Sequence, residues 1–503
     1  MTKEKTEHII ERSPVIVVMG HIDHGKSTLL DYIRKTNVVE GEAGSITQHV
    51  SAYEVIHKNV NGDDKRITFI DTPGHSAFSA MRSRGANIAD IAILIISAED
   101  GVKPQTLEAY NSIQEAKIPF VIAINKIDKP NANIQKVKNE LIENGIYVEG
   151  SGGDISFVPI SSKSGEGIPE LLDMMLLIAE MEDYKGDSSL LAEGFVLESK
   201  VDPQKGVDTM LIIKEGAIKR GDFLMVNNQV SPIRRLEDFL GNPIDEAIFS
   251  SPVRIIGCCD VPDAGLPFKT YSSKKEAEKD LVEGSVSVTN NIILNNAENS
   301  AEAVEIFLII KADVFGTIEA IKKEIAKIDT DRVIIKVISE GVGDIAENDV
   351  KMASHNPNTL IVGFNTKISQ AMINLSEQMK VKVASFDIIY KLTEWLEENI
   401  LTLIPKIKVE EKLGRAKILA MFNKAKDEQI VGAKVKEGRI KLGSEVRIMR
   451  RDFEIGLGKV TNLQKQKIQT QEVNEGDEFG IGIKAKKEIA IGDYIEAFET
   501  IEK

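Results

Sequence analysis

The sequence predicts a multidomain protein of mixed α and β structure, with two α/β domains, two small β-barrels and a long connecting helix. Three observations predict this fold class. Residues 13–182 and 303–380 alternate apolar runs of strand length with helical patterns, which is typical of parallel α/β sheets. Residues 190–270 instead carry short β runs between Gly, Asn and Pro turns, which favours a small antiparallel barrel. An internal repeat then predicts a second barrel near the C-terminus.

The repeat has two copies of eight residues. The run Lys-Glu-Gly-Ala-Ile-Lys-Arg-Gly at 214–221 recurs as Lys-Glu-Gly-Arg-Ile-Lys-Leu-Gly at 436–443, and a β run follows each copy, at 223–226 and 446–449. We interpret the repeat as a sign of two similar barrels. The alternative is coincidence between two Lys- and Gly-rich hairpins.

The remaining segments connect these domains. Residues 388–404 have helical spacing and end at Pro405. A helix of this length spans about 25 Å, and it would either hold the last barrel away from the body or pack on the preceding domain. The predicted organisation is a tail at 1–12, an α/β domain at 13–182, a short linker at 184–189, a barrel at 190–270, a linker with one helix at 271–302, a small α/β/α domain at 303–380, the connecting helix at 381–405 and a C-terminal barrel at 406–503.

Composition excludes several protein classes. The chain has 503 residues, of which 42% are hydrophobic and 28% charged, as in an ordinary water-soluble protein. No apolar stretch reaches the roughly 18 residues that a membrane helix needs, and the first residues lack the apolar core of a secretory signal. The only cysteines, Cys258 and Cys259, are adjacent, so we expect two buried free thiols in a reducing cytoplasm.

Charge is distributed unevenly. The net charge is −15, yet residues 406–467 hold 17 Lys and Arg against 8 Asp and Glu. A basic segment in an acidic chain suggests a region that contacts a phosphate backbone. A solvated Lys-rich face is the alternative, and charge alone does not separate the two.

The most informative motif lies near the N-terminus. The run Gly20-His21-Ile22-Asp23-His24-Gly25-Lys26-Ser27 fits G-x-x-x-x-G-K-[ST], the phosphate-binding P-loop, and it lies between an apolar strand and a helix that continues at Thr28. Backbone N–H groups and the helix N-terminus would point at phosphate, with Lys26 at the outer phosphates and Ser27 on Mg²⁺. We expect the side chains of His21 and His24 to face solvent.

A second motif selects the base. Asn125-Lys126-Ile127-Asp128 follows a buried strand, and a carboxylate at Asp128 can accept hydrogen bonds from N1–H and the 2-amino group of guanine. Adenine offers neither donor there, so the carboxylate would stay unpaired. The Lys126 stem would cover the base. Ser161, Ser162 and Lys163 follow another strand and would contact the base edge.

A third motif predicts a switch. Asp71-Thr72-Pro73-Gly74-His75 ends a strand, so that Asp71 would hold Mg²⁺ through water and the N–H of Gly74 would sense the γ-phosphate. His75 is the candidate catalytic residue that orients the attacking water. Upstream, the small-residue segment 41–49 offers Thr47 as a further Mg²⁺ ligand. The predicted ligands are therefore GTP or GDP and Mg²⁺, with Ser27, Thr47 and Asp71 at the metal.

Together these motifs resemble the translational GTPases, and within them the bacterial type of translation initiation factor two. In the first domain, the resemblance rests on residues 20–31, 41–49 and 71–78. Further along the chain, it rests on Lys311-Ala312-Asp313-Val314, on Gly316, on residues 341–343 and on Ile388-Ile389-Tyr390. It covers nearly the whole chain from residue 13 and implies a P-loop GTPase domain followed by the domains predicted above.

The chain departs from the family pattern in its last domain. The family commonly has cysteines where this chain has Ala433 and Phe479, and a Lys-Arg-Phe-Lys run where it has Gln464 to Lys467, with Gln466 at the aromatic position. Ser45 also replaces a usual glycine. The resemblance places the end of initiator tRNA in this region. The implied tRNA-binding residues are Arg439, Lys465, Lys467 and Gly480.

The resemblance implies a cytoplasmic, monomeric factor that hydrolyses GTP, acts on both ribosomal subunits and promotes binding of initiator tRNA and subunit joining. Ribosome-stimulated hydrolysis would then release it. Three alternatives are open: an elongation-type carrier of aminoacyl-tRNA, a P-loop metabolic kinase, and a GTP-dependent ribosome-binding module with little catalysis. The domain order argues against an elongation-type carrier. The motif from Asn125 to Asp128 argues against a kinase, and the motif from Asp71 to His75 argues against a module with little catalysis.

Overall fold

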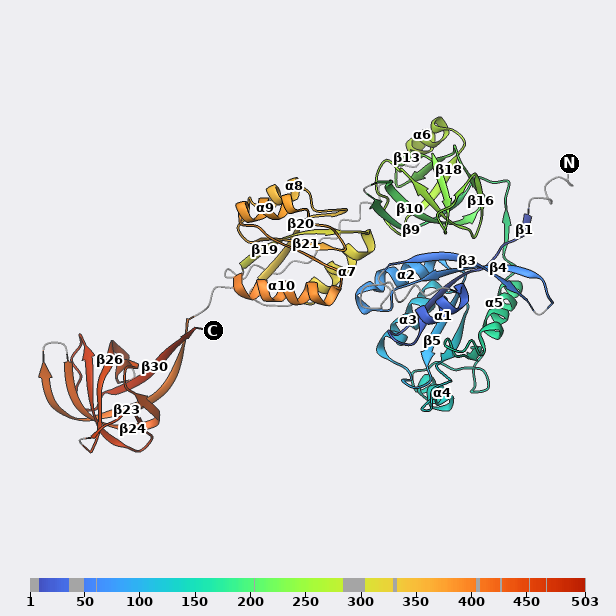
Figure 1. Cartoon of the computed structure of the whole chain (residues 1–503). Helices are drawn as coiled ribbons and strands as arrows, with labels where there is room; N and C mark the ends of the chain where they lie inside the picture. The colour runs from blue at the N-terminus through green and yellow to red at the C-terminus, as the bar shows by residue number, and fades with distance from the viewer. Residues whose placement is uncertain are drawn as a thin grey trace. The chain divides into compact units, whose positions relative to one another are not determined.

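The computed structural model describes residues 9–35, 49–59, 61–202, 204–283, 304–328, 333–403, 408–425, 428–451, 453–466 and 468–502. The chain divides into two compact units, Met1–Leu403 and Ile404–Lys503 (Figure 1). In the parts described, no helix combines the length and apolar character needed to cross a membrane.

The first domain of the larger unit is built on a six-stranded sheet of order β3-β4-β2-β5-β6-β7, parallel except for β3 at one edge. The central strands are continuous apolar runs because helices cover both faces of the sheet. Parallel strands end at one edge, where the loops that carry the sequence motifs meet. The strands are β2 (Val15–Gly20), β3 (Ser51–Lys58), β4 (Asp64–Asp71), β5 (Ile91–Ser97), β6 (Phe120–Asn125) and β7 (Phe157–Pro159), and the helices are α1 (Lys26–Arg34), η4 (Ser76–Phe78), α2 (Ser79–Ile88), α3 (Pro104–Ala116), α4 (Ile134–Glu143) and α5 (Ile168–Glu182).

The predicted tail and first linker both contain a strand. β1 (Ile9–Glu11) pairs antiparallel with β8 (Lys185–Asp187), so the residues before the P-loop strand are anchored beside the end of α5. Arg12 continues this anchor, because its guanidinium binds Asp90 at 2.7 Å.

The second domain is antiparallel. Its eight-stranded sheet has the order β13-β12-β18-β9-β10-β17-β14-β15, and β11 and β16 form a separate pair. Helix α6 (Lys274–Glu283) follows it. The strands are β9 (Glu193–Asp202), β10 (Gly206–Glu215), β11 (Ala217–Lys219), β12 (Phe223–Val226), β13 (Gln229–Pro232), β14 (Arg235–Asp238), β15 (Pro243–Ile244), β16 (Glu246–Ile248), β17 (Pro252–Ile256) and β18 (Pro267–Tyr271).

The expectation of two buried thiols in this domain is wrong for one of them. Cys258 is buried in the apolar core of the domain, whereas Cys259 is exposed. Cys259 lies in a bend after the end of β17, and its backbone N–H donates to the hydroxyl of Ser231 while its side chain stays outside the core.

The second domain is attached to the first through Asp90. Lys214 of β10 binds the Asp90 carboxylate at 2.5 Å, opposite Arg12. Burial alone would raise the pKa of Asp90, but the hydrogen bond from Arg12 and the charge of Lys214 hold it below its usual value. Two cations thus compensate one buried carboxylate at this junction.

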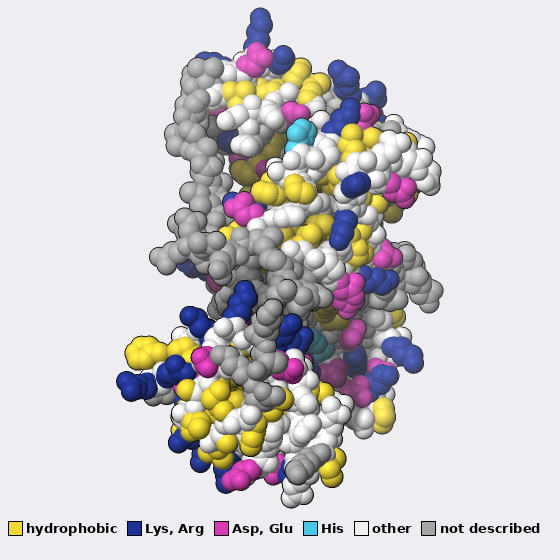
Figure 2. All heavy atoms as spheres, turned by 90° about the vertical axis from the view of Figure 1, so that its left-hand side faces the viewer, with side chains coloured by type: hydrophobic (Ala, Val, Ile, Leu, Met, Phe, Trp, Pro, Cys, Tyr) yellow, Lys and Arg dark blue, Asp and Glu magenta, His cyan; other side chains and the backbone are white. Residues whose placement is uncertain are grey.

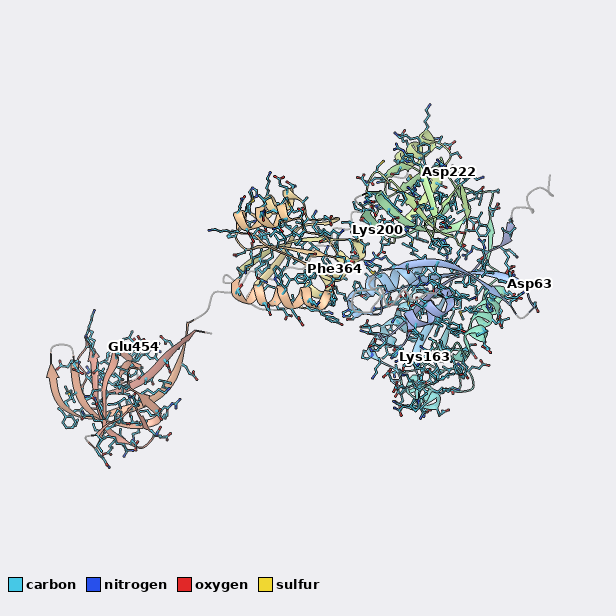
Figure 3. The ribbon with its side chains drawn as sticks, viewed as in Figure 1. Asp63, Lys163, Lys200, Asp222, Phe364 and Glu454 are labelled. Carbon is cyan, nitrogen blue, oxygen red and sulfur yellow. The ribbon has the colours of Figure 1, made fainter. Side chains whose placement is uncertain are left out.

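The third domain is a three-layer α/β/α sandwich. Its parallel sheet has the order β20-β19-β21-β22, with α8 and α9 packed on one face and α7 and α10 on the other (Figure 1). Phe364 lies in this sheet and Lys200 at its junction with the second domain (Figure 3), where Lys200 forms a β-bridge with Val314. The elements are β19 (Val304–Ala312), α7 (Phe315–Ile325), β20 (Val333–Val342), α8 (Glu347–Ala353), β21 (Thr359–Phe364), α9 (Gln370–Met379), β22 (Lys382–Phe386) and α10 (Ile389–Leu403).

The segment predicted as a connecting helix differs from the expectation. Residues 382–386 form the fourth strand of the sheet, and α10 packs against that sheet through Leu392, Leu396 and Ile400, each at most 2% exposed. Trp395 also contacts Phe386 of β22, with ring centroids 5.7 Å apart. The helix therefore belongs to the third domain, as the alternative interpretation held.

The second unit is a closed barrel. The strands β23, β30, β25, β26, β29 and β24 pair in that order, and β23 pairs with β24 to close the ring. The core is formed by the inward-facing apolar residues of these strands. The strands are β23 (Lys408–Ala425), β24 (Glu428–Lys441), β25 (Glu445–Arg450), β26 (Phe453–Lys465), β27 (Ile468–Gln469), β28 (Glu472–Asn474), β29 (Glu478–Ala485) and β30 (Tyr494–Glu502).

The two copies of the repeat have the same backbone conformation at both glycines. Gly216 and Gly221 have φ values of 78° and 102°, and Gly438 and Gly443 have 68° and 86°. These left-handed conformations favour glycine. Each copy is followed by a strand, β12 or β25.

Candidate functional site

The P-loop connects β2 to α1. Gly25 has a φ of 91°, and a Cβ built on it would lie 2.3 Å from the side-chain nitrogen of Asn125. Glycine is therefore required both by the turn and by the close approach of the base-binding loop. Asp23, which has a φ of 62°, shows that the loop turns sharply just before it reaches the helix.

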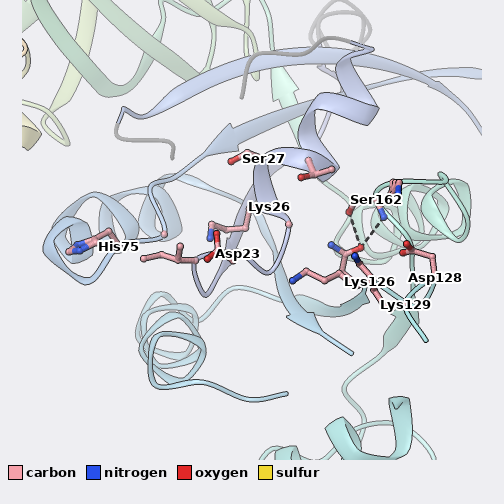
Figure 4. Close-up of a pocket in the computed structure, with 14 residues that line it drawn as sticks. Asp23, Lys26, Ser27, His75, Lys126, Asp128, Lys129 and Ser162 are labelled. Carbon is pink, nitrogen blue, oxygen red and sulfur yellow. Dashed lines mark hydrogen bonds between the residues drawn. The ribbon is translucent and has the colours of Figure 1, made fainter. Parts of the chain in front are cut away.

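The loops at the carboxyl edge of the sheet enclose a cavity of about 360 Å³ (Figure 4). All but one of its lining residues were predicted from the motifs; the exception is Lys129, whose position directly after Asp128 was an available signal. The lining residues are Ile22, Asp23, Gly25, Lys26, Ser27, Thr28, Gly74, His75, Asn125, Lys126, Asp128, Lys129, Ser162 and Lys163.

The other predicted nucleotide-site residues do not line this cavity. Thr72 is fully buried, and its hydroxyl donates to the carbonyl of Val18 at 3.1 Å, so its side chain links β4 to β2. Asp71, 3% exposed, ends β4 opposite Val18. The members of this set are Gly20, His21, His24, Asp71, Thr72, Pro73 and Ser161.

The expectation that His24 faces solvent is wrong. Its side chain is fully buried, and burial lowers its pKa to about 3. The edge of this ring meets His21 at a centroid distance of 4.9 Å, and His24 is not among the residues that line the cavity. The buried imidazole is therefore neutral, and burial also lowers the pKa of the half-buried His21.

Lys26 lies under the loop that carries Gly74. Its ammonium donates to the carbonyls of Gly20 at 3.0 Å and His21 at 2.7 Å. Burial lowers its pKa to about 8, although the charge of Asp71 opposes the shift. A Cβ on Gly74 would lie 2.4 Å from this ammonium, so a larger residue there would displace the end of the Lys26 side chain.

Asn125 ties the base-binding loops to the P-loop. Its side-chain nitrogen donates to the carbonyl of His24 at 2.8 Å, and its oxygen accepts from the backbone N–H and the hydroxyl of Ser162, both at 2.9 Å. One amide thereby fixes three segments that are distant in sequence.

The carboxylate predicted to specify the base, Asp128, is held in a similar way. The Ser161 hydroxyl donates to Asp128 at 2.7 Å, and this bond lowers the pKa of Asp128. Lys126 is oriented by Asp100, which lies 3.3 Å from its ammonium. Asp100 was not singled out from the sequence, because its role depends on the meeting of two loops.

His75 lies at one end of the cavity, with its ring directed away from Lys26 and Asp23 (Figure 4). It is 5% exposed, and Nδ1 accepts the backbone N–H of Ala77 at 2.9 Å. Burial lowers the pKa of the imidazole. The ring is therefore neutral near pH 7, with its proton on Nε2.

Two residues that support the site were missed by sequence reasoning. Arg82 of α2 is 1% exposed; it donates to the carbonyl of His75 at 2.5 Å and binds Glu108 of α3 at 2.7 Å. Gln105 accepts the N–H of Ile22 at 3.1 Å. A buried arginine in an otherwise ordinary helix gives no periodic signal, and these contacts are tertiary.

The predicted Mg²⁺ ligands are only partly described. Ser27 lines the cavity and Asp71 lies behind it, close enough for its charge to act on Lys26; Thr47 lies outside the described residues. Hydroxyl and carboxylate oxygens are the ligands Mg²⁺ prefers, with phosphates and waters completing the shell. No cluster of three or more His, Cys, Asp and Glu ligands occurs in the described part of the chain.

The predicted tRNA-binding residues belong to the barrel unit. Gly480 pairs with Gln464, and Lys465 binds Asp477 at 2.7 Å. Arg439 pairs with Asn474 of the adjoining strand β28. The backbone N–H of Asn474 donates to the carboxylate of Asp477 at 3.4 Å. Three of the four predicted residues thus share one edge of the barrel; Lys467 lies outside the described residues.

The basic segment does not form a purely positive face. Many of its cations have acidic partners, including Arg439 with Glu472 at 3.7 Å. On the face shown in Figure 2, Lys and Arg side chains are interspersed with Asp and Glu. Ala433 and Phe479, which pair across β24 and β29, are buried in the barrel core.

Comparisons with protein families match the domains in order. Residues 11–181 match the family described as Elongation factor Tu GTP binding domain, and residues 191–270 match Elongation factor G domain 2. Residues 281–397 match Translation-initiation factor 2, and residues 414–502 match Elongation factor Tu domain 4.

Curated relatives match almost the entire chain. The Translation initiation factor IF-2 of Halothermothrix orenii is 41% identical, with 99% of this chain and 73% of that protein covered. The IF-2 of Rubrobacter xylanophilus is 38% identical with the same coverage. Among solved structures, GDP-bound aIF5B from Aeropyrum pernix has a TM-score of 0.49 and 27% identity, covering 97% of this chain and 92% of that one. The chain, with its GTP-binding domain and its guanine-specifying motif, belongs to the translation initiation factor IF-2 family and is a GTPase of translation initiation.

Proposed function

We propose that this protein binds GTP with Mg²⁺, promotes binding of initiator tRNA and joining of the ribosomal subunits, and leaves after ribosome-stimulated hydrolysis. The observation that carries the proposal is the single cavity that joins the P-loop, the switch loop at Gly74 and His75, and the guanine-specifying Asp128. We assign the protein to initiation rather than elongation because its relatives are IF-2 proteins.

Guanine would bind between the Lys126 stem and the loop of Ser162, with N1–H and the 2-amino group donating to Asp128. The carboxylate is already oriented by Ser161, so little ordering remains for binding. An adenine ring offers no donor to the remaining carboxylate oxygen of Asp128, which rejects ATP.

The triphosphate would lie over the N-terminus of α1. Lys26 would exchange the carbonyls of Gly20 and His21 for phosphate oxygens, and Ser27, Thr47 and Asp71 would hold Mg²⁺, which neutralises phosphate charge when bound. The N–H of Gly74 would bind the γ-phosphate, so that loss of this phosphate frees the switch loop.

Hydrolysis would require His75 to turn toward the cavity and orient a water molecule. In the conformation described, its ring points away and Nδ1 is already bonded to Ala77. The isolated protein should therefore hydrolyse GTP slowly, and ribosomes should accelerate the reaction by stabilising the turned conformation.

The barrel would carry initiator tRNA at the edge that holds Arg439, Lys465 and Gly480, with Lys467, outside the described residues, as the fourth predicted contact. Ala433 and Phe479 would take part only from within the core, because their side chains fill it. Comparing the affinity of formylated and unformylated initiator tRNA decides whether the formyl group is read there; equal affinities would exclude a formyl-specific pocket.

The central test measures GTP hydrolysis with and without ribosomes for the natural protein and for His75→Ala. We expect strong ribosome stimulation that His75→Ala abolishes, with GDP affinity retained, and GTP binding that excess ATP does not displace. Rapid hydrolysis without ribosomes would contradict the mechanism. Full stimulation of His75→Ala would remove the catalytic assignment.

A further inference from the structure

The ring of His75 rests against the first turn of α10. Its centroid lies 4.5 Å from that of Tyr390, with the planes inclined by 69°, and 6.1 Å from that of Phe78. This edge-to-face geometry is one that aromatic pairs prefer. His75 therefore has a defined partner in the orientation that faces away from the phosphate end of the cavity.

Tyr390 is placed there by a well-packed helix but is not itself part of the core. Its neighbours Ile389 and Leu392 are at most 1% exposed, whereas Tyr390 is 49% exposed. Helical geometry puts the flanking apolar residues into the third domain and directs Tyr390 outward to His75. Changing its ring should thus alter the contact without emptying a core position.

The adjoining helix α7 contacts the segment that follows His75. Lys323 donates to the carbonyl of Ser76 at 3.1 Å and to the hydroxyl of Ser79 at 2.5 Å. Arg84 of α2 binds Glu319 of α7 at 2.5 Å. A Cβ on Gly316 would lie 2.3 Å from the terminal methyl of Met81, so the two helices touch closely. The third domain thereby contacts the switch segment at several consecutive points.

We propose that Tyr390 is a positioning residue for hydrolysis, which retains His75 in the orientation turned away from the phosphates until α10 moves. The proposal rests on the assigned role of His75 in orienting water. Turning His75 toward the cavity breaks the ring contact with Tyr390, so any movement of the third domain that separates the two rings favours the hydrolytic orientation. One aromatic contact of this kind shifts such an equilibrium about two- to tenfold.

The activity test compares Tyr390→Ala with Tyr390→Phe in the full chain, without ribosomes. Tyr390→Ala should raise kcat for GTP hydrolysis about two- to tenfold with an unchanged KM, and Tyr390→Phe, which keeps the ring, should behave as the natural protein. The gain should vanish in Tyr390→Ala combined with His75→Ala. Tyr147→Ala is the matched control, because Tyr147 is also 49% exposed and is not one of the described aromatic rings in contact with His75, which are Phe78 and Tyr390.

A second measurement does not depend on activity. The imidazole proton resonances of His75, assigned by comparison with His75→Ala, should lose a ring-current shift in Tyr390→Ala and keep it in Tyr390→Phe. An unchanged shift in Tyr390→Ala, or a kcat that does not rise, would overturn the proposal. A rise in kcat that persists when Tyr390→Ala is combined with His75→Ala would also overturn the proposal. Failure of the proposed function is recognised separately, by ribosome stimulation that survives His75→Ala alone.

Discussion

We expect Lys26 to make nucleotide binding sensitive to alkaline pH. Burial lowers its pKa from 10.5 to about 8. Between these two values the unfolded chain binds more protons than the folded one, so the cost of burying the ammonium is fully present below pH 8 and is relieved as the pH rises. Phosphates favour the charged form, so binding of GDP should draw a proton back onto Lys26.

We therefore predict proton uptake on GDP binding at about pH 9, and an affinity that weakens by up to about tenfold per pH unit in this range. Calorimetry in two buffers of different ionisation enthalpy measures the uptake. At about pH 7 Lys26 is already charged, so uptake at this group should disappear, which serves as the internal control. No uptake at the higher pH would show that Lys26 is charged in both states.

Arg82 supports the switch loop through backbone carbonyls. Arg82→Met would leave the carbonyl of His75 without its buried donor, and we expect a loss of about 1–3 kcal/mol in the free energy of unfolding. Its partner Glu108 is 47% exposed and would be hydrated, which keeps the loss below that for a buried pair.

Chemical denaturation measures this loss. The control is Arg66→Met, whose pair with Glu54 is long, at 3.7 Å, and partly exposed, so its effect should stay below about 1 kcal/mol. Similar losses in the two variants would mean that Arg82 does not stabilise the loop in the way its contacts suggest.

At the scale of single residues, the sequence predicted which residue types gather at the site better than it predicted how their side chains are oriented. Lys26, Asn125 and Asp128 all line one cavity, because a short motif determines both residue type and loop geometry. The burial of His24 and the direction of His75 were not predictable. They depend on what packs against the loops, and Tyr390 is more than 300 residues away in the chain.

At the scale of elements, α10 is stabilised by the sheet beneath it. Leu396 is 2% exposed in that interface, so Leu396→Ala should lower the free energy of unfolding of the third domain by about 2–5 kcal/mol. The exposed neighbour Glu397 supplies the control, since Glu397→Ala should change stability by no more than about 0.5 kcal/mol.

Hydrogen exchange followed along the chain locates the effect. Faster exchange should appear in β21, β22 and α10 and not in the barrel strands, because the barrel is a separate unit with its own core. A Leu396→Ala protein with undiminished stability would indicate a helix that does not depend on this packing.

The elements also show why the predicted boundaries differ from the structure. Helical spacing located α10 to within a residue at each end, whereas the strand β22 directly before it was missed. A five-residue strand with only partly buried side chains has a weak pattern, and its place in the sheet comes from pairing with β21.

At the scale of the whole molecule, the GTP site and the predicted tRNA edge lie in different units. The barrel closes on itself and buries its own core, so its surface can be considered alone. The cations proposed to bind tRNA already have acidic partners there: Arg439 is paired with Glu472 and Lys465 with Asp477. A tRNA phosphate must displace these carboxylates, which makes binding an exchange of partners.

This exchange predicts opposite effects for the two members of a pair. Arg439→Ala and Lys465→Ala should each weaken binding of initiator tRNA and reduce the slope of log affinity against log salt by about 0.7–0.9. Glu472→Ala should strengthen binding, because it leaves Arg439 unpaired and available to phosphate. Filter binding or fluorescence anisotropy across a salt series measures both quantities. If neither cation alters the slope and Glu472→Ala is neutral, tRNA does not bind this edge, since any phosphate contact there must release counterions.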